Sequence, residues 1–313
     1  MILTLTLNPA IDKTINISNF KLGTVNRVDN SRLDAGGKGI NVSKVLKVLG
    51  GKSIALGILA GANGDFIKNH LDNENIENDF IKTKGETRVN LKIVDKINNQ
   101  YTDINENFQV DESMFDLLKD KIISLLNKYK DEKNVVVLSG SIPKGLNTNI
   151  YKDLILDIKK TNAKVILDAE AELFTKGIEA APYLIKPNID ELKATFNVTI
   201  NNEDDIISVS RKIINSGVHI VVVSLGGEGS LLITKDEVLK VHGLKVTVKS
   251  TVGAGDSMVA ALAFSLEQNY PLDQTLKLAS AVSTANVMTD GTQTGKPEDI
   301  EKILNLVKIE KIN

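Results

Sequence analysis

The sequence predicts an α/β protein with a mostly parallel central sheet covered by helices on both faces. Apolar, β-branched runs such as NVVVLSG (134–140), KVILD (164–168) and HIVVVSLG (219–226) alternate with amphipathic segments such as DESMFDLLKDKIISLLNKY (111–129). Parallel strands that are buried on both faces have such continuous apolar runs. No linker rich in Pro, Gly or Ser and no internal repeat interrupts the pattern, so we expect one domain over residues 1–313.

The remaining body elements follow from the same periodicities. ILTLTL is typical of a strand, and INVSKVLKVLG of a helix that stops at Gly50 and Gly51. Further along, the patterns predict a strand in SIALGIL, helices in GDFIKNHLDNEN and TNIYKDLILDIKK, a strand in YLIKPN and a helix around IISVSRKIINSG.

Two early segments alternate polar and apolar residues, which is typical of strands with one face in solvent. DKTINI and VNRVDNSRL form the first, and TRVNLKIVDKINNQYTDINE forms a hairpin around an Asn-Asn turn. These strands, from about 12–33 and 86–106, do not fit the parallel body. We expect them to form a small β lid.

Composition narrows the class of function. The chain has 313 residues, 42% hydrophobic and 25% charged, with a formal charge of −2. A net charge this close to zero does not attract nucleic acid or a membrane surface to the protein. Cysteine is absent and the three histidines are scattered, which excludes thiolate chemistry and disfavours a histidine metal site. With no signal peptide or membrane-spanning run in the sequence, we expect a cytoplasmic protein.

The stretch TVGAGDS (251–257) precedes an apolar helical run and predicts an anion site. Glycines allow the N–H groups of Gly253, Ala254, Gly255 and Asp256 to converge, and the helix dipole adds positive potential. Asp256 would lie beside a phosphoryl group in transfer, where it could accept a proton from an attacking hydroxyl. We expect the helix terminus to keep it ionised and therefore a weak base. The alternative is that Asp256 only caps the helix.

A second glycine turn, AGGKGINV (35–42), precedes another helix. Gly36, Gly37 and Gly39 surround Lys38, and Asn41 lies one turn inside the helix. Such a turn can wrap closely around a small polar ligand, although a flexible turn has the same composition. GGKS (50–53) is not a phosphate-binding P-loop, because position 46 is leucine and a strand follows.

Two motifs at strand ends are candidates for nucleotide and metal binding. SLGGEGSLL (224–232) is a strand, a glycine turn and a strand, which permits close approach of an adenine-bearing ligand but is also a common turn. In KPNIDEL (186–192), Asn188 and Glu191 lie on one helical face and can orient a hydrated Mg²⁺. The alternative for this pair is a helix cap.

Isolated polar residues complete the candidates. Asp12 follows the first strand, and Ser139 lies in LSGS at a strand end. Arg27 and Arg88 fall in the predicted lid strands, where a phosphorylated substrate would meet them.

Together these motifs resemble the ribokinase-like (phosphofructokinase B) carbohydrate kinases. The resemblance runs the whole length, through TLTLNPAID, GTVNRV, AGGKGINVSKVL, GETRVNLKI, LSGSIPKG, KPNIDEL, VSLGGEGSLL and TVGAGDS in the order of the family. It implies a three-layer α/β/α ribokinase-like fold with a small β-sheet lid, and ATP-dependent phosphorylation of a sugar hydroxyl. It also implies a homodimer formed through the lid strands.

The resemblance further implies a role for each candidate. Asp256 is the base, and the backbone of Gly253, Ala254, Gly255 and Asp256 forms the anion hole. The residues that bind the sugar hydroxyls are Asp12, Gly37, Lys38 and Asn41. Those that bind the substrate phosphate are Arg27, Arg88 and Ser139. ATP is bound by Lys186, Asn188, Ser224, Gly226 and Gly229. Glu191 contacts the hydration shell of Mg²⁺.

TLNPAID, VNRV and TRVN are similar to the branch of the family that acts on sugar monophosphates. Fructose 1-phosphate is the expected substrate and tagatose 6-phosphate the alternative. A non-catalytic regulator that binds a sugar phosphate or a nucleotide on the same fold is an alternative from another class. A dehydrogenase is disfavoured because the dinucleotide-binding fingerprint is absent near the start.

Overall fold

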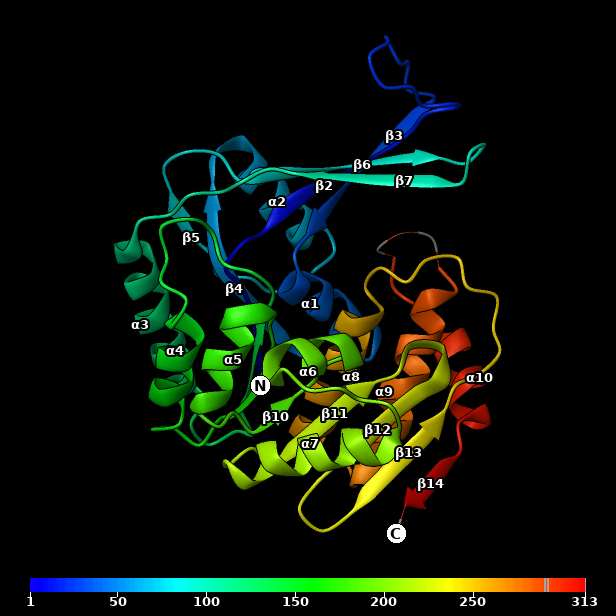
Figure 1. Ribbon diagram of the computed structural model, residues 1–313. Coiled ribbons are helices and arrows are strands. Elements are labelled where there is room, and N and C mark those ends of the chain that lie inside the picture. The colour runs from blue at the N-terminus through cyan, green and yellow to red at the C-terminus, as the bar shows by residue number, and fades with distance from the viewer. Residues whose placement is uncertain (290, 292, 313) are drawn as a thin grey trace.

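The structure is a computed structural model that describes residues 1–289, 291 and 293–312. A ten-stranded sheet forms the body of the protein (Figure 1). Its strands, in order across the sheet, are β14 (Ile309–Ile312), β13 (Val238–His242), β12 (Gly229–Ile233), β11 (Ile220–Ser224), β10 (Leu184–Ile185), β9 (Lys164–Asp168), β8 (Val135–Ser139), β1 (Ile2–Thr6), β4 (Ser53–Ala60) and β5 (Ile81–Thr83). The strands from β5 to β11 are parallel, and β12, β13 and β14 are antiparallel to their neighbours.

Helices cover both faces of this sheet, which confirms the predicted three-layer α/β/α class. One face carries α3 (Glu112–Lys128), α4 (Ile150–Ile158), α5 (Ala171–Glu179), α6 (Ile189–Phe196) and α7 (Glu203–Asn215). The other carries α1 (Lys38–Val48), α8 (Ala254–Gln268), α9 (Leu272–Val287) and α10 (Pro297–Leu306).

The apolar strand runs are explained by burial on both faces. In β8, Val136 and Leu138 pack into the core under α3 and α4, whereas Val135 and Val137 pack into the core under α1 and α8. Successive side chains of a strand point to opposite faces, so a strand between two helix layers needs apolar residues at every position.

The lid is a separate four-stranded sheet in the order β3 (Asn30–Gly36), β2 (Ala10–Asn16), β6 (Arg88–Asp95) and β7 (Gln100–Asn105). It lies above the body in Figure 1, with α2 (Gly61–Asn73) beside it. The predicted hairpin at 86–106 is confirmed. The other predicted segment differs, because VNRV belongs to a loop and β3 begins only at Asn30.

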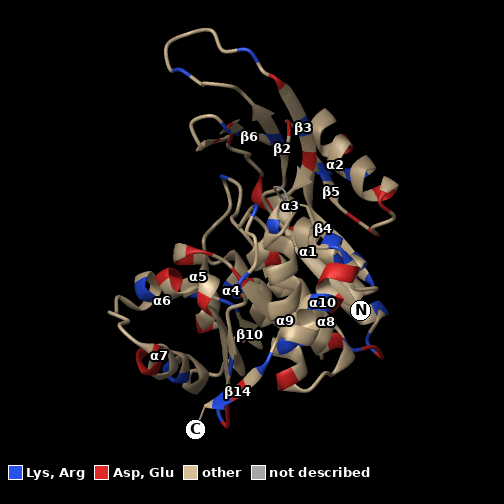
Figure 2. Cartoon of the chain, turned by 90° about the vertical axis from the view of Figure 1, so that its right-hand side faces the viewer, with Lys and Arg blue, Asp and Glu red and all other residues tan. Residues whose placement is uncertain are grey.

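The loop between β2 and β3 extends past the rest of the lid, as Figure 2 shows from the side. Its apolar residues Leu22 and Val25 are 88% and 87% exposed. In the described residues, no helix has the length and apolar character needed to cross a membrane.

Candidate active site

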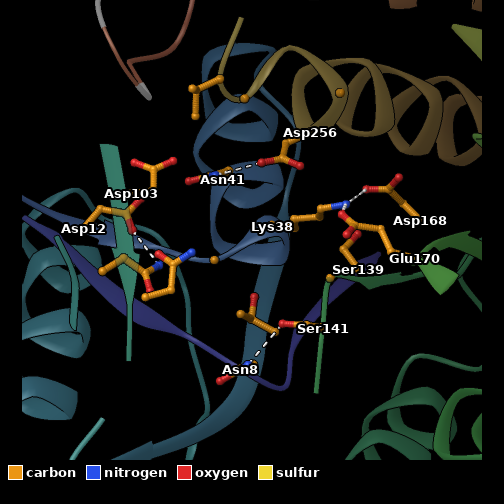
Figure 3. A pocket seen from close by; sticks show the side chains of 18 of the residues that line it. Asn8, Asp12, Lys38, Asn41, Asp103, Ser139, Ser141, Asp168, Glu170 and Asp256 are labelled. Carbon is orange, nitrogen blue, oxygen red and sulfur yellow. Dashed lines mark hydrogen bonds and ion pairs between the residues drawn. The ribbon is translucent and has the colours of Figure 1, made fainter. Parts of the chain in front are cut away.

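A cavity of about 570 Å³ lies between the lid and the carboxyl edge of the body sheet (Figure 3). Residues at or just after the ends of β1, β8, β9 and β10 line it, together with the N-termini of α1 and α8 and one face of the lid. The following sequence-predicted residues meet there: Asp12, Gly37, Lys38, Asn41, Arg88, Ser139, Lys186, Asn188, Glu191, Ser224, Gly253, Gly255 and Asp256.

A second cavity of about 340 Å³ adjoins the first and holds three more of the predicted residues, Gly226, Gly229 and Ala254. The turn η1 (Gly226–Glu228) forms one wall, and apolar side chains such as Val241, Leu244 and Met258 form others. Gly229 has a φ of 112°, and a Cβ there would lie 1.9 Å from the carbonyl oxygen of Val241, so no other residue fits. Asn188, Ser224 and Gly255 line both cavities.

The junction of the two cavities is the N-terminus of α8. Gly253 is the N-cap residue, with a left-handed φ of 82° that glycine adopts without strain, and no side chain caps the helix. Within the described residues, the N–H groups of Gly255 and Asp256 have no hydrogen-bond acceptor. These N–H groups and the helix dipole make the turn suitable for an anion.

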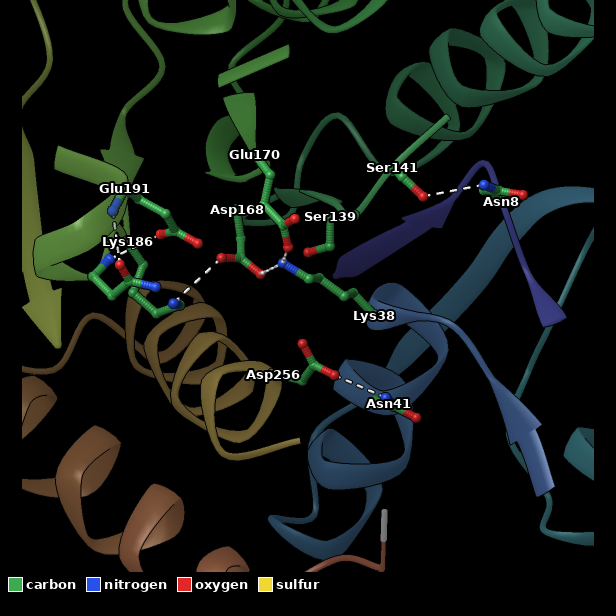
Figure 4. A network of polar contacts seen from close by, with 12 residues as sticks. Asn8, Lys38, Asn41, Ser139, Ser141, Asp168, Glu170, Lys186, Glu191 and Asp256 are labelled. Carbon is green, nitrogen blue, oxygen red and sulfur yellow. Dashed lines mark hydrogen bonds and ion pairs between the residues drawn. The ribbon is translucent and has the colours of Figure 1, made fainter. Parts of the chain in front are cut away.

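The side chain of Asp256 does not cap the helix, so the capping alternative is wrong. Its Oδ2 accepts a hydrogen bond of 2.8 Å from Nδ2 of Asn41, on α1 (Figure 4). Asp256 is 7% exposed. Two glycine turns far apart in the sequence therefore bring one carboxylate and one amide together.

Burial, followed by the negative charge of Asp168, raises the pKa of Asp256 to about 6. The hydrogen bond from Asn41 and the charges of Lys38 and Lys186 oppose this rise. Desolvation therefore makes Asp256 a stronger base than the sequence predicts. Asp256 remains mostly ionised at neutral pH and is a better proton acceptor than an ordinary aspartate.

A network of charges lies beside Asp256 (Figure 4). Nζ of Lys38 is 2.8 Å from Glu170 and 3.7 Å from Asp168, and Nζ of Lys186 is 3.3 Å from Asp168. Although burial acts in the opposite direction, the two lysines lower the pKa of Asp168, and Asp168 with Glu170 raises that of Lys38. Lys38 is thus held charged beside the N-terminus of α8, and Lys186 pairs with the same Asp168.

Sequence reasoning missed Asp168 and Glu170. Asp168 ends the buried strand KVILD, and an acid at the carboxyl end of a parallel strand is a signal that could have identified it. Glu170 lies at the start of α5, and nothing in its sequence position indicates that it contacts Lys38.

Asn188 and Glu191 form a capping box, as their alternative interpretation predicts. The Asn188 side chain accepts from the N–H of Glu191, and Oε2 of Glu191 accepts from the N–H of Asn188, both at 2.8 Å. Burial raises the pKa of Glu191. Both residues also line the cavity, and the second carboxylate oxygen of Glu191 has no hydrogen bond within the described chain. Capping and ligand binding are therefore compatible here.

The cavity is lined by polar side chains, and only some of them have hydrogen-bond partners within the protein. Asp12 accepts hydrogen bonds from Asn90 at 3.0 Å and from Lys92 at 2.9 Å. Within the described residues, the following buried atoms of cavity residues have no hydrogen-bond partner: Thr6 Oγ1, Asn8 Oδ1, Asn41 Oδ1, Arg88 Nε, Asn90 Oδ1 and Ser139 Oγ. Buried polar atoms of this kind are costly unless a ligand pairs with them. A ligand with several hydroxyl groups would do so.

Arg88 is anchored at the cavity wall. Its guanidinium donates to the carbonyl oxygens of Asn8 and Glu106, at 3.0 and 3.5 Å. Burial lowers its pKa, although Asp12 acts in the opposite direction.

Asp12 lies in β2 of the lid, as the strand predicted in DKTINI implies. One predicted position needs correction. Arg27 lies in the exposed loop between β2 and β3 and does not line either cavity of its own chain.

The fold and the site define an α/β protein with two adjoining cavities that meet at a helix N-terminus beside a carboxylate. Residues 5–299 match the model of the pfkB family carbohydrate kinases, so the chain belongs to that family.

Relatives and solved structures agree with this membership. The chain is 36% identical to a 1-phosphofructokinase of Borreliella burgdorferi, over 100% of this chain and 99% of that protein. It is also 36% identical to a tagatose-6-phosphate kinase of Staphylococcus epidermidis, over 99% and 100%. The structure of phosphofructokinase-2 from Escherichia coli in complex with fructose-6-phosphate is similar, with a TM-score of 0.90, 28% identity and 97% and 98% coverage. A tetrameric inhibited form of that protein gives a TM-score of 0.89, with 28% identity and the same coverage.

The raised pKa of Asp256 predicts a pH-dependent cost to stability. The folded-state pKa of about 6 lies above the ordinary value of 3.8, so folding disfavours ionisation. The cost is absent below pH 4, grows between pH 4 and 6 and is complete above pH 6. Asp256→Asn should therefore increase the free energy of unfolding by about 2–3 kcal/mol at pH 8 and by little at pH 4. Urea denaturation at both pH values measures this, with the exposed Asp236→Asn as a control. An equal effect of Asp256→Asn at both pH values would contradict the assignment.

Proposed function

We propose that the protein transfers the γ-phosphoryl group of ATP to the C6 hydroxyl of D-fructose 1-phosphate, giving D-fructose 1,6-bisphosphate and ADP. The observation that carries this proposal is the junction of the two cavities at Gly255, beside Asp256. The polar cavity suits a sugar phosphate, and the cavity lined by glycines and apolar side chains suits an adenine nucleotide.

In the proposed mechanism, Asp256 accepts the proton of the C6 hydroxyl as its oxygen attacks the γ-phosphorus. The bond between the γ-phosphorus and the bridging oxygen breaks, ADP leaves with that oxygen, and the proton passes from Asp256 to water. Free N–H groups at the start of α8 and the ammonium of Lys186 stabilise the negative charge of the phosphoryl group in transfer. A pKa of about 6 gives Asp256 useful basicity while it stays mostly ionised at pH 7.

Magnesium fits this site through water rather than through direct ligands. In the described part of the chain, no three acidic or histidine side chains are grouped to hold a metal. Glu191 has one free carboxylate oxygen facing this region and would hold the hydration shell, with Asn188 beside it. When bound to ATP, the ion supplies charge neutralisation of the phosphates.

Fructose 1-phosphate is preferred because several of the similar proteins carry the name 1-phosphofructokinase. Tagatose 6-phosphate is the second candidate, because an equally similar relative is named for it. ATP and sugar phosphates are metabolites of the cell interior, so the proposed reaction implies a cytoplasmic location.

A panel of sugars tests the substrate. With Mg²⁺ and ATP, ADP release should be faster with a sugar phosphate than with a free sugar, because the cavity carries cations at its lid end, and fastest with D-fructose 1-phosphate. Coupled assays compare this sugar with D-tagatose 6-phosphate, D-fructose and D-ribose. A higher kcat/KM for tagatose 6-phosphate would move the assignment to the second candidate. Faster reaction with an unphosphorylated sugar would contradict both, and ligand binding without turnover would favour the non-catalytic regulator.

The role of Asp256 as the base predicts a specific loss. Asp256→Asn should lower kcat by about 10²–10⁴-fold, because an amide accepts no proton from the hydroxyl. The Kd for ATP should stay within a few fold. The kcat/KM of the wild-type protein should fall on the acid side of pH 6, where the carboxylate becomes protonated. Near-normal turnover by the variant would remove Asp256 from this role.

We also propose a homodimer formed through the lids. The lid face turned away from the cavity carries the exposed apolar side chains of Leu33 and Ile104, and the loop beyond it carries Leu22 and Val25. Exposed apolar groups gathered in this way are typical of protein interfaces. In such a dimer, Arg27 could serve the cavity of the partner, since it does not line its own.

A charged residue on this face should break the dimer. Ile104 and Leu117 are each 52% exposed, but Leu117 lies on α3, away from the lid. Sedimentation velocity should find a dimer for the wild-type protein and Leu117→Lys, and a monomer for Ile104→Lys. A dimer that persists in Ile104→Lys would argue against this interface.

A further inference from the structure

The cavity face of the lid carries a row of polar side chains set by strand alternation. Arg88, Asn90 and Lys92 are alternate residues of β6 and all line the cavity, as do Asp12 on β2 and Asp103 on β7. Leu91, between two of them, points to the opposite face, where it packs near Ile93. Lys92 is therefore part of the cavity wall, although none of the motifs in the sequence assigns it a role.

Lys92 is held in place by Asp12. Its ammonium lies 2.9 Å from Oδ2 of Asp12, while the other oxygen of Asp12 accepts from Asn90. The Asp12 side chain is 9% exposed and that of Lys92 is 22% exposed. An ammonium has three N–H donors, so Lys92 keeps two for a ligand after it has paired with Asp12. Asp103 lies opposite Lys92 in the ladder and is exposed, so water screens its charge.

The other cations of the cavity are committed elsewhere. Lys38 and Lys186 are held by buried Asp168 next to Asp256, at the end where phosphoryl transfer is proposed. Arg88 and Lys92 are the two cations on the lid side of the cavity. They are four residues apart on β6, and at 3.3 Å per residue their Cα atoms lie about 13 Å apart. Arg88 uses two of its five N–H donors on the carbonyl oxygens of Asn8 and Glu106, so the others remain for a ligand that reaches both cations.

Asp12 makes the charge of Lys92 necessary. A sugar monophosphate carries close to two negative charges, and an unpaired carboxylate in the cavity wall would repel it. An uncharged sugar meets no such repulsion, because it needs only hydrogen bonds from this wall.

We propose that Lys92 is a specificity-determining residue that selects a phosphorylated over an unphosphorylated sugar. Its ammonium neutralises Asp12 and, together with Arg88, binds the phosphate that the substrate already carries. This inference rests on the proposed function, since it concerns the sugar-phosphate site of that reaction.

Lys92→Met tests the proposal, because it keeps the length of the side chain and removes the charge. The KM for D-fructose 1-phosphate should rise at least about 30-fold with kcat within about threefold, which is the pattern of a lost ground-state contact. The kcat/KM for D-fructose should change less than threefold. Lys92→Arg should restore most of the affinity for the phosphorylated sugar. Lys84→Met, which removes an exposed charge between β5 and β6, is the matched control and should behave as wild type.

Calorimetric titration of the same proteins with D-fructose 1-phosphate keeps this test separate from the test of the reaction. A wild-type protein that binds this sugar phosphate without phosphorylating it contradicts the proposed function, and a 30-fold weaker Kd in Lys92→Met still supports the inference. An unchanged Kd in Lys92→Met overturns the inference whether or not the wild-type protein is a kinase. An equal loss of kcat/KM for fructose and fructose 1-phosphate also overturns it, because a structural role alone would affect both.

Discussion

The proposed chemistry of this protein depends on one carboxylate that is buried at the start of a helix. Asp256 receives a hydrogen bond from Asn41, and this bond joins the N-terminal turns of α8 and α1 across the carboxyl edge of the sheet. Both turns are rich in glycine, so the backbone can approach a ligand where side chains would block it. Desolvation at this position gives the carboxylate a pKa suited to proton transfer near neutral pH.

Nearby positive charges lower the free-energy cost of burying the ionised carboxylate of Asp256. Asp168 is buried at the cavity wall and pairs with both Lys38 and Lys186, which places two ammonium groups near the N-terminus of α8. Breaking such a buried network usually costs more than its formation contributes, because the remaining charge is left without a partner. The arrangement therefore favours a function in which a highly charged ligand enters between these groups, as a nucleoside triphosphate does.

Much of the fold could be predicted from the sequence, because strands buried on both faces and amphipathic helices have distinct periodicities. The glycine turns likewise predicted the uncapped N-terminus of α8 at the cavity. What could not be predicted depends on contacts between distant segments: the pairing of Lys38 with Glu170, and the burial that raises the pKa of Asp256. Arg27 was misplaced because its loop has the alternation of a strand but extends into solvent, where no neighbouring strand pairs with it.

A crystal structure with D-fructose 1-phosphate and a non-hydrolysable ATP analogue tests the central claim most directly. The account predicts that the C6 hydroxyl lies within hydrogen-bond distance of the Asp256 carboxylate, about 2.6–3.2 Å, with the γ-phosphate at the start of α8. A complex in which Asp256 points away from every sugar oxygen, or in which the phosphate already on the sugar occupies the turn at Gly253, would contradict it.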